Sequence, residues 1–211
     1  MRYSEAARIQ LYGTDLYEKY QGLYGSDMNI TYEDILRDGT IQALEKYRQR
    51  GKFRKFRIFR NIYLDKALID ACKYGNVRLI KSLIRRGAYP KAEDNLPIIR
   101  ACGALRWRDS DTDLGLVQYL VEDCGADPRA RNDRPLVIAS FTSSPKGDDT
   151  PFKIIQYLVE ECGANPRAYM IRPSKSAVNL ARLEGHLDVA DYLAKVKPRN
   201  LDNIPKSQKF I

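Results

Sequence analysis

The sequence predicts an all-α fold of stacked helix pairs, and three observations carry this prediction. Glycine–alanine pairs at 87–88, 125–126 and 163–164 stand 38 residues apart, and a proline, a basic residue and an alanine follow each pair. Two short apolar segments, each with the spacing of one helix face, lie between successive pairs. Neither segment is long enough to form a stable helix alone, so stacking on neighbouring repeats must supply the core.

The first complete repeat shows the pattern most simply. Apolar residues recur at helical spacing from Leu64 to Cys72, and a second set recurs after Gly75, from Val77 to Ile84. We therefore expect a helix, a tight turn at Gly75, and a second helix that Gly87 closes in the left-handed conformation.

The next two repeats are longer than the first. The inner alanine of the first helix precedes the closing glycine by 16 positions in the first repeat and by 24 positions in the next two. About seven of the eight extra residues fall between the paired helices, in ALRWRDSDTD and TSSPKGDDT. Thr112 and Thr150 lie near the ends of these insertions and suit the N-cap of a second helix.

The flanking segments are less regular. TIQALEKYRQRG at 40–51 aligns with NVRLIKSLIRRG at 76–87, which predicts a degenerate repeat that begins near Thr31 and, with a basic segment, occupies residues 31–63. Residues 1–30 are rich in tyrosine, and we expect them to form a helical N-terminal cap. About four full repeats cover residues 64–197. Residues 198–211 lack periodicity and contain two prolines, so we interpret them as a C-terminal tail.

Several of these features resemble the ankyrin repeat family. The shared features are the glycine–alanine pair that closes each second helix, Pro97-Ile98 and Pro135-Leu136 where the family opens its first helix with Thr-Pro-Leu-His, and Gly185-His186-Leu187 before the last second helix. The resemblance covers about residues 64–197. It implies an ankyrin-type helical repeat solenoid that holds a protein partner with its loop tips and concave face.

The chain also departs from the family pattern. Ile99, Val137 and Asn179 replace the histidine of the helix-opening stretch, which removes the side chain of the family's usual hydrogen-bonded turn. The ECGADPRA style of repeat, with its long insertions, resembles the ankyrin proteins that large DNA viruses encode. That resemblance implies a viral protein, for which a virion location is an option.

Composition predicts an intracellular protein of the cytoplasm or nucleus. No apolar run approaches the 18 or more residues of a membrane span, and the start MRYSEAARIQ lacks the apolar stretch of a secretory signal. Four cysteines in 211 residues are too sparse for a disulfide scaffold. We expect free thiols in the core, because Cys124 and Cys162 occupy equivalent repeat positions, as do Cys72 and Cys102.

The net charge of +9 is concentrated in one segment. Residues 46–61 read KYRQRGKFRKFRIFRN, with eight basic residues and no acidic one, and the rest of the chain holds 28 basic and 27 acidic residues. Basic groups that alternate with aromatic rings suit nucleic acid or another anionic assembly. The candidate residues for that surface are Lys52, Arg54, Lys55, Arg57 and Arg60. The alternative is a linker whose phenylalanines cover the end of the first full repeat.

Two other groups are candidates for binding a protein partner. Trp107, between Arg106 and Arg108, stands in the first insertion, and Trp and Arg are the residues that most often anchor interfaces. Its alternative role is to pack back on the first helix. A basic residue also recurs once per repeat, as Lys91, Arg129 and Arg167. These three form either a stripe for an acidic partner or a solvated edge.

The sequence does not predict an enzyme, a metal site or a cofactor. His186 is the only histidine, and we interpret it as a turn residue with a structural hydrogen bond. Asp109, Asp111 and Asp113 resemble the opening of a calcium loop, but Leu114 and Leu120 stand where that loop needs glycine and glutamate. The favoured function is a non-enzymatic protein-interaction module of unknown oligomeric state, with binding of nucleic acid or an anionic assembly through residues 46–61 as the alternative.

Overall fold

The computed structural model describes residues 32–50, 60–103, 110–142 and 150–197, and at some helix ends it describes the backbone alone. These residues are predominantly helical, and the all-α prediction is confirmed for them. Their one β-type pairing is an isolated antiparallel bridge between Tyr169 and Ser176. The chain divides into two compact units, Met1–Tyr89 and Pro90–Ile211, which are described in turn. The predicted N-terminal cap, residues 1–30, and the predicted C-terminal tail, residues 198–211, lie outside the described ranges.

The first compact unit contains two helix pairs. They are α3 (Tyr32–Asp38) with α4 (Ile41–Arg50), and α5 (Arg60–Tyr74) with α6 (Val77–Arg85). The first helices α3 and α5 pack on each other, and so do the second helices α4 and α6. The side chains buried between them are apolar and include Ile35, Leu36, Leu44, Leu68, Ile69, Leu79, Ile80 and Leu83. Their burial is the main source of stability for helices this short.

A buried asparagine joins the turns of these two pairs. The Oδ1 atom of Asn76 accepts the N–H of Leu79 at 3.1 Å and so caps α6, while its Nδ2 donates to the carbonyl of Gly39 at 3.0 Å. Gly39 itself cannot carry a side chain here, because a Cβ would lie 2.6 Å from the carbonyl oxygen of Ile35. One amide therefore satisfies groups in both turns, which favours asparagine at position 76.

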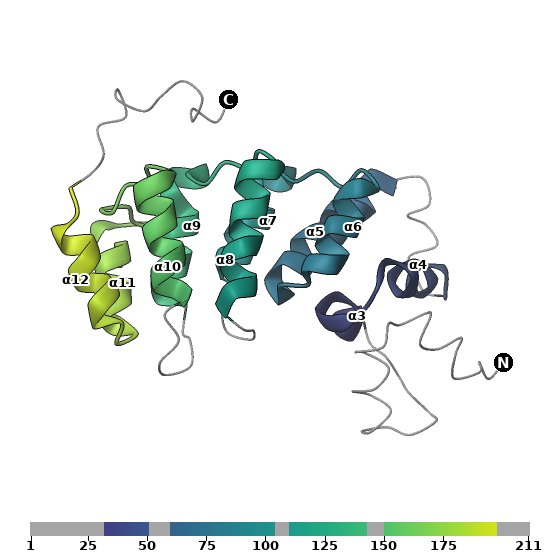
Figure 1. The fold of residues 1–211 in the computed structure, drawn as a ribbon, viewed down its shortest axis with the longest axis horizontal. Coiled ribbons are helices and arrows are strands. Elements are labelled where there is room, and N and C mark those ends of the chain that lie inside the picture. Colours follow the sequence, from purple (N-terminus) through teal and green to yellow (C-terminus); the bar gives the residue numbers. More distant parts are fainter. Residues whose placement is uncertain (1–31, 51–59, 104–109, 143–149, 198–211) are drawn as a thin grey trace. The chain divides into compact units, whose positions relative to one another are not determined.

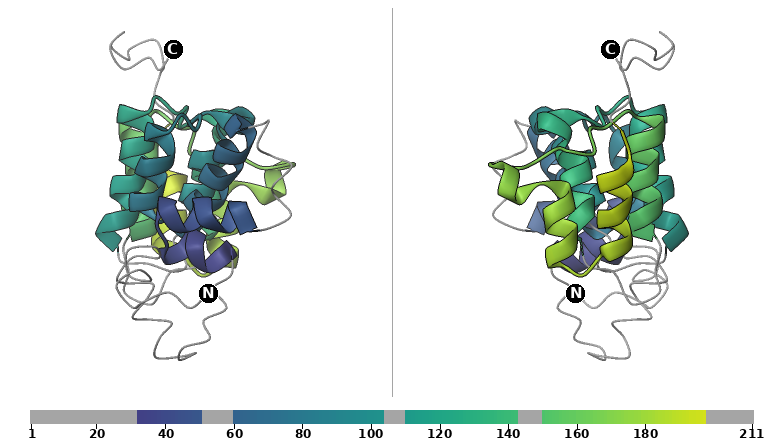
Figure 2. Two further views of the ribbon diagram at one scale, coloured as in Figure 1. Left: turned by 90° about the vertical axis from the view of Figure 1, so that its right-hand side faces the viewer. Right: turned by 90° about the vertical axis from the view of Figure 1, so that its left-hand side faces the viewer.

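The second compact unit contains three helix pairs in two layers. Helices α7 (Ala92–Cys102), α9 (Ala130–Phe141) and α11 (Ala177–Leu183) pack side by side as the first layer. The second layer consists of α8 (Ser110–Gln118), α10 (Thr150–Gln156) and α12 (Leu187–Lys195). Successive pairs follow one another in Figure 1, and the layers are seen end-on in Figure 2. The ring of Phe152 meets the ring of Tyr192 edge-on, with centroids 5.2 Å apart, and so joins α10 to α12.

The second helices of the two longer repeats end in a π turn. These turns are η2 (Tyr119–Asp123) and η3 (Tyr157–Glu161). At the end of α6, the N–H of Ala88 donates to the carbonyl of Leu83, five residues back, whereas the N–H of Ala126 donates to that of Leu120, six residues back. Each π turn thus accommodates one inserted residue. Each longer repeat has eight extra residues, of which about seven lie between its paired helices, and the π turn accounts for the remaining one.

Both α7 and α9 open with a left-handed turn of three residues without glycine. The positive φ angles are 47° to 60° at Glu93, Asp94 and Asn95, and 52° to 60° at Arg131, Asn132 and Asp133. Each such residue costs about 1–2 kcal/mol, so surrounding interactions must hold the turn. Pro97 and Pro135 then fall in the first regular helical turn, where a missing N–H is tolerated.

The predicted helix starts need one correction. Helix α8 begins at Ser110, so Thr112 lies inside its first turn and not before it. Thr150 is the first residue of α10, with Pro151 next. The acidic and hydroxyl residues that precede the apolar pattern at 114–117 are compatible with a first helical turn, and the helix extends into them.

Candidate partner-binding surface

The three basic residues at equivalent repeat positions lie in different surroundings. The Nε of Arg129 donates to Oδ1 of Asp133 at 2.9 Å, and Asp133 is only 6% exposed. A buried carboxylate without a partner is strongly destabilising, so this guanidinium has a structural role. The head of Lys91 lies along the closing turn, with its Cε and Nζ 3.8 Å from the place of a Cβ on Gly125.

Arg167 differs from the other two. It is exposed, its backbone N–H donates to Oδ1 of Asn165 at 3.0 Å, and its guanidinium pairs with no residue in the described ranges. Of these three basic groups, Arg167 is therefore the one whose charge is turned to solvent.

Side-chain oxygens accept hydrogen bonds from the backbone of two closing turns. The Oδ1 of Asp65 accepts the N–H of Tyr89 at 2.6 Å, and the Oδ1 of Asn95 accepts that of Asp127 at 2.8 Å. Each N–H belongs to the residue two positions after the closing glycine. The same hydrogen bond therefore recurs in successive repeats with aspartate or asparagine as the acceptor.

The left-handed turns of α7 and α9 are also tied to each other. The guanidinium of Arg131 donates to the carbonyl of Glu93, and its Nε donates to Oδ2 of Asp94 at 3.1 Å. Both charged side chains are exposed, so this pair adds little stability by itself. It does neutralise the charges at the tips of two consecutive turns.

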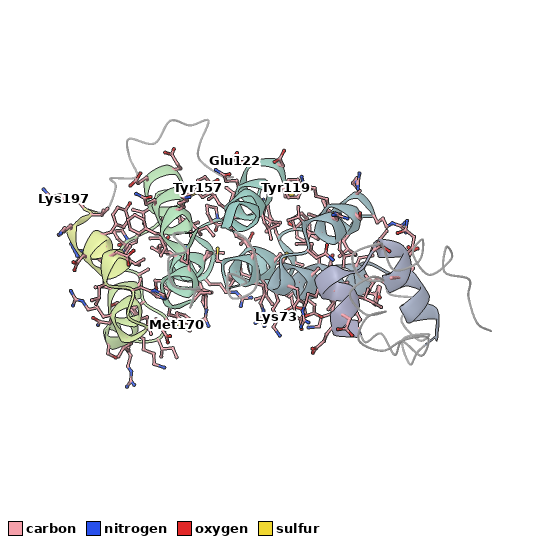
Figure 3. The ribbon with its side chains drawn as sticks, turned by 60° about the horizontal axis from the view of Figure 1, so that its bottom comes forward. Lys73, Tyr119, Glu122, Tyr157, Met170 and Lys197 are labelled. Atoms are coloured by element: carbon pink, nitrogen blue, oxygen red, sulfur yellow. The ribbon has the colours of Figure 1, made fainter. Side chains whose placement is uncertain are left out.

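The third turn of this series is built differently, and we call residues 167–176 the finger. The N–H of Met170 donates to the carbonyl of Lys175 at 3.2 Å, and the N–H of Ala177 donates to that of Ala168 at 2.9 Å. A 3₁₀ turn, η4 (Pro173–Lys175), closes the tip. Figure 2 shows this segment standing clear of the helices beside it, and Figure 3 labels Met170.

The finger exposes both apolar and basic side chains. Ile171 is 74% exposed and Tyr169 is 49% exposed, and Arg172 and Lys175 are exposed as well. The prediction from sequence included Arg167 but missed the rest of this surface. A signal was present, because Tyr-Met-Ile follows Ala168, whereas Glu-Asp-Asn and Arg-Asn-Asp follow the corresponding alanines of the two earlier repeats.

Tyrosine–glutamate hydrogen bonds link successive second helices. The hydroxyl of Tyr157 donates to Oε1 of Glu122 at 2.9 Å, and that of Tyr192 donates to Oε1 of Glu160 at 2.6 Å. Figure 3 labels Tyr157 and Glu122 where η3 meets η2. Burial raises the pKa of both tyrosines, and the neighbouring glutamates raise it further. Both hydroxyls therefore remain protonated donors.

All four cysteines are free thiols. The core prediction holds for Cys72, Cys102 and Cys162, which are buried, whereas Cys124 is half-buried. Burial raises the pKa of Cys102, and it raises the pKa of Cys162 to about 12. A thiol with so high a pKa is a weak nucleophile at neutral pH.

His186 precedes α12 at the N-cap position without a capping bond from its side chain. Its Nε2 is buried and has no hydrogen-bond partner within the part of the chain that the structure describes. The predicted structural bond through this atom is therefore not made by a described residue. The backbone N–H of His186 does close the turn, by donating to the carbonyl of Ala181 at 2.8 Å.

Most of the predicted anchors fall outside the described residues. Arg106, Trp107 and Arg108 do so, and so do Lys52, Arg54, Lys55 and Arg57. Arg60 is the first residue of α5, and only the backbone of Arg60 is described. Both candidate surfaces therefore stay predictions from sequence.

No described helix is long and apolar enough to cross a membrane, and no described group of His, Cys, Asp or Glu side chains could hold a metal ion. No family model, no curated protein and no solved structure matches the chain.

Proposed function

We propose that this chain is an ankyrin-type repeat protein that works as a non-enzymatic protein-interaction module. The observation that carries the proposal is the recurrence of one hydrogen bond in two successive repeats, from the N–H of Tyr89 to Asp65 and from the N–H of Asp127 to Asn95. A repeated bond of this kind indicates that the helix pairs are copies of one stacking unit. Stacked repeats present extended surfaces whose main use is to hold another macromolecule.

The division of labour among the side chains supports a binding role. The side chains of Arg129, Asn95 and Tyr157 form hydrogen bonds to other residues of the chain. The insertion that contains Trp107 and the finger are the places where the repeats differ. Surface positions that stacking does not require are the ones free to specify a partner.

Partner capture tests the proposal. The full chain, tagged and expressed in its native cell, should retain a protein that then binds the purified chain directly. Trp107→Ala should weaken that binding while circular dichroism shows unchanged helix content, because interface tryptophans often dominate binding energy. Lys195→Ala, an exposed change on α12, serves as the control. If no captured protein binds the purified chain, the proposal fails.

The concentration of basic charge in residues 46–61 supports the second candidate function. Titration with single-stranded and duplex nucleic acid over a range of salt should then show affinity that falls steeply with salt, because phosphate contacts release counterions. Exchanging Arg54 and Arg57 for glutamine should reduce the salt slope. A flat salt response, or no binding, removes this candidate.

A further inference from the structure

The finger and the residues next to it in the sequence are basic. From Cys162 to Leu183 the sequence contains no aspartate or glutamate, and its basic residues are Arg167, Arg172, Lys175 and Arg182. All four are exposed, and no described residue forms an ion pair with any of them. By contrast, Arg129 and Arg131 in the preceding turn pair with Asp133 and Asp94.

The exposed apolar side chains of the finger stand on a backbone with internal hydrogen bonds. Tyr169 pairs with Ser176 in an antiparallel bridge, and the N–H of Lys175 donates to the carbonyl of Arg172 at 2.8 Å. Ile171 lies between these contacts and is 74% exposed. A large exposed aliphatic group on a loop with internal backbone hydrogen bonds is suited to anchor a partner.

We propose that the finger binds an acidic segment of a protein partner, in which an apolar side chain packs against Ile171 and Tyr169. The charges of Arg167, Arg172 and Lys175, which pair with none of the described residues, supply the electrostatic complement to such a segment. Tyr169 and the basic groups would also suit nucleic acid, but Ile171 is 74% exposed and neither stacks on bases nor bonds phosphate, which favours a polypeptide. This inference rests on the proposed function and names the partner chemistry at one surface of the module.

Selection from a random 12-residue peptide display library tests the proposal on the full chain. Enriched peptides should be acidic and carry a large apolar residue. Synthetic copies should bind with a Kd that rises about tenfold in Ile171→Ser and in the pair Arg172→Glu with Lys175→Glu. Binding should also weaken as salt is added.

Matched controls keep loss of fold apart from loss of binding. Leu187→Ser removes another aliphatic side chain of the last repeat, which is 64% exposed, and Lys195→Glu reverses an exposed charge outside the finger. Both should leave the Kd within about twofold of the unchanged chain. Circular dichroism and thermal unfolding should be alike for all variants.

Several results would overturn the inference. They are no enrichment, enrichment without acidic residues, or peptides that bind the finger variants as well as the unchanged chain. Tighter binding of a single-stranded oligonucleotide that the same variants abolish would assign the finger to nucleic acid. Self-association in sedimentation that Ile171→Ser abolishes would assign it to a second copy. If a captured partner responds to Trp107→Ala but not to the finger variants, the proposed function stands and only this inference fails.

Discussion

The turns that open α7 and α9 differ from the finger, although all three follow a closing glycine in the same register. In the first two, side chains satisfy one another, as Arg131 does with Asp94. In the finger, the basic side chains pair with no described residue and Ile171 is turned to solvent. The comparison teaches that one repeat position can carry side chains that pair with each other in one copy and side chains that are exposed to solvent in the next. Four changes test how sharp that division is.

Arg129→Ala should have the largest effect on stability. It leaves the buried carboxylate of Asp133 without its partner, and we expect the free energy of unfolding to fall by about 3 kcal/mol in urea denaturation. The matched control is Arg167→Ala at the equivalent position, which should change it by less than about 0.5 kcal/mol. Equal losses in both variants would erase the distinction between the turns and the finger.

Asn95→Ala should rank second. It removes the acceptor for the N–H of Asp127 and places alanine at a positive φ, so we expect a loss of about 2 kcal/mol. Asn132→Ala carries only the φ effect, because the exposed Asn132 forms no side-chain hydrogen bond to a closing turn within the described ranges, and should cost about 1 kcal/mol. Asn95→Asp keeps an acceptor and should recover most of the loss. A loss in Asn95→Ala no greater than in Asn132→Ala would refute the role of the bond.

Tyr157→Phe should cost about 1 kcal/mol at neutral pH, because it removes the hydroxyl that binds Glu122. The dependence of stability on pH provides a second test of this hydroxyl. Since the pKa of Tyr157 is raised in the folded chain, the unfolded chain loses this proton first, and stability should decline as pH rises above about 10. Thermal unfolding at pH 8 and pH 10.5 should therefore show a smaller decline for Tyr157→Phe. A decline as large as in the unchanged chain would mean that the other raised groups, such as Cys162, account for it.

Ile171→Ser should have the smallest effect on stability. The side chain is largely exposed and packs in no core, so urea denaturation should detect a change below about 0.5 kcal/mol. A loss above about 1 kcal/mol would show that Ile171 supports the fold and would weaken the contrast with the paired turns.

The repeating part of the fold could be predicted from the sequence. Apolar spacing identified the helix pairs, and the closing glycines at 87, 125 and 163 do adopt the expected positive φ. The π turns could not be told apart from the loop insertions. One extra residue in a helix and one extra residue in a loop both lengthen the distance in sequence from the inner alanine to the closing glycine by one. The left-handed turns were missed because charged residues and asparagine, not glycine, occupy them.

The candidate surface was harder to predict than the fold. Tyr169, Met170 and Ile171 have the composition of a core segment, and only the backbone bonds at 168–177 show that they lie on a loop. The basic residue that recurs in each repeat did not show that Arg129 pairs with a carboxylate whereas Arg167 pairs with no described residue. Asp133 reaches Arg129 through a local backbone geometry that the sequence pattern does not reveal.

The most direct test of the binding account is the affinity of one purified partner for two variants measured side by side by titration calorimetry. We predict that Ile171→Ser raises the Kd about tenfold without altering stability, and that Tyr157→Phe lowers stability but leaves the Kd within about twofold. An unchanged Kd for Ile171→Ser, together with a weakened one for Tyr157→Phe, would contradict the account.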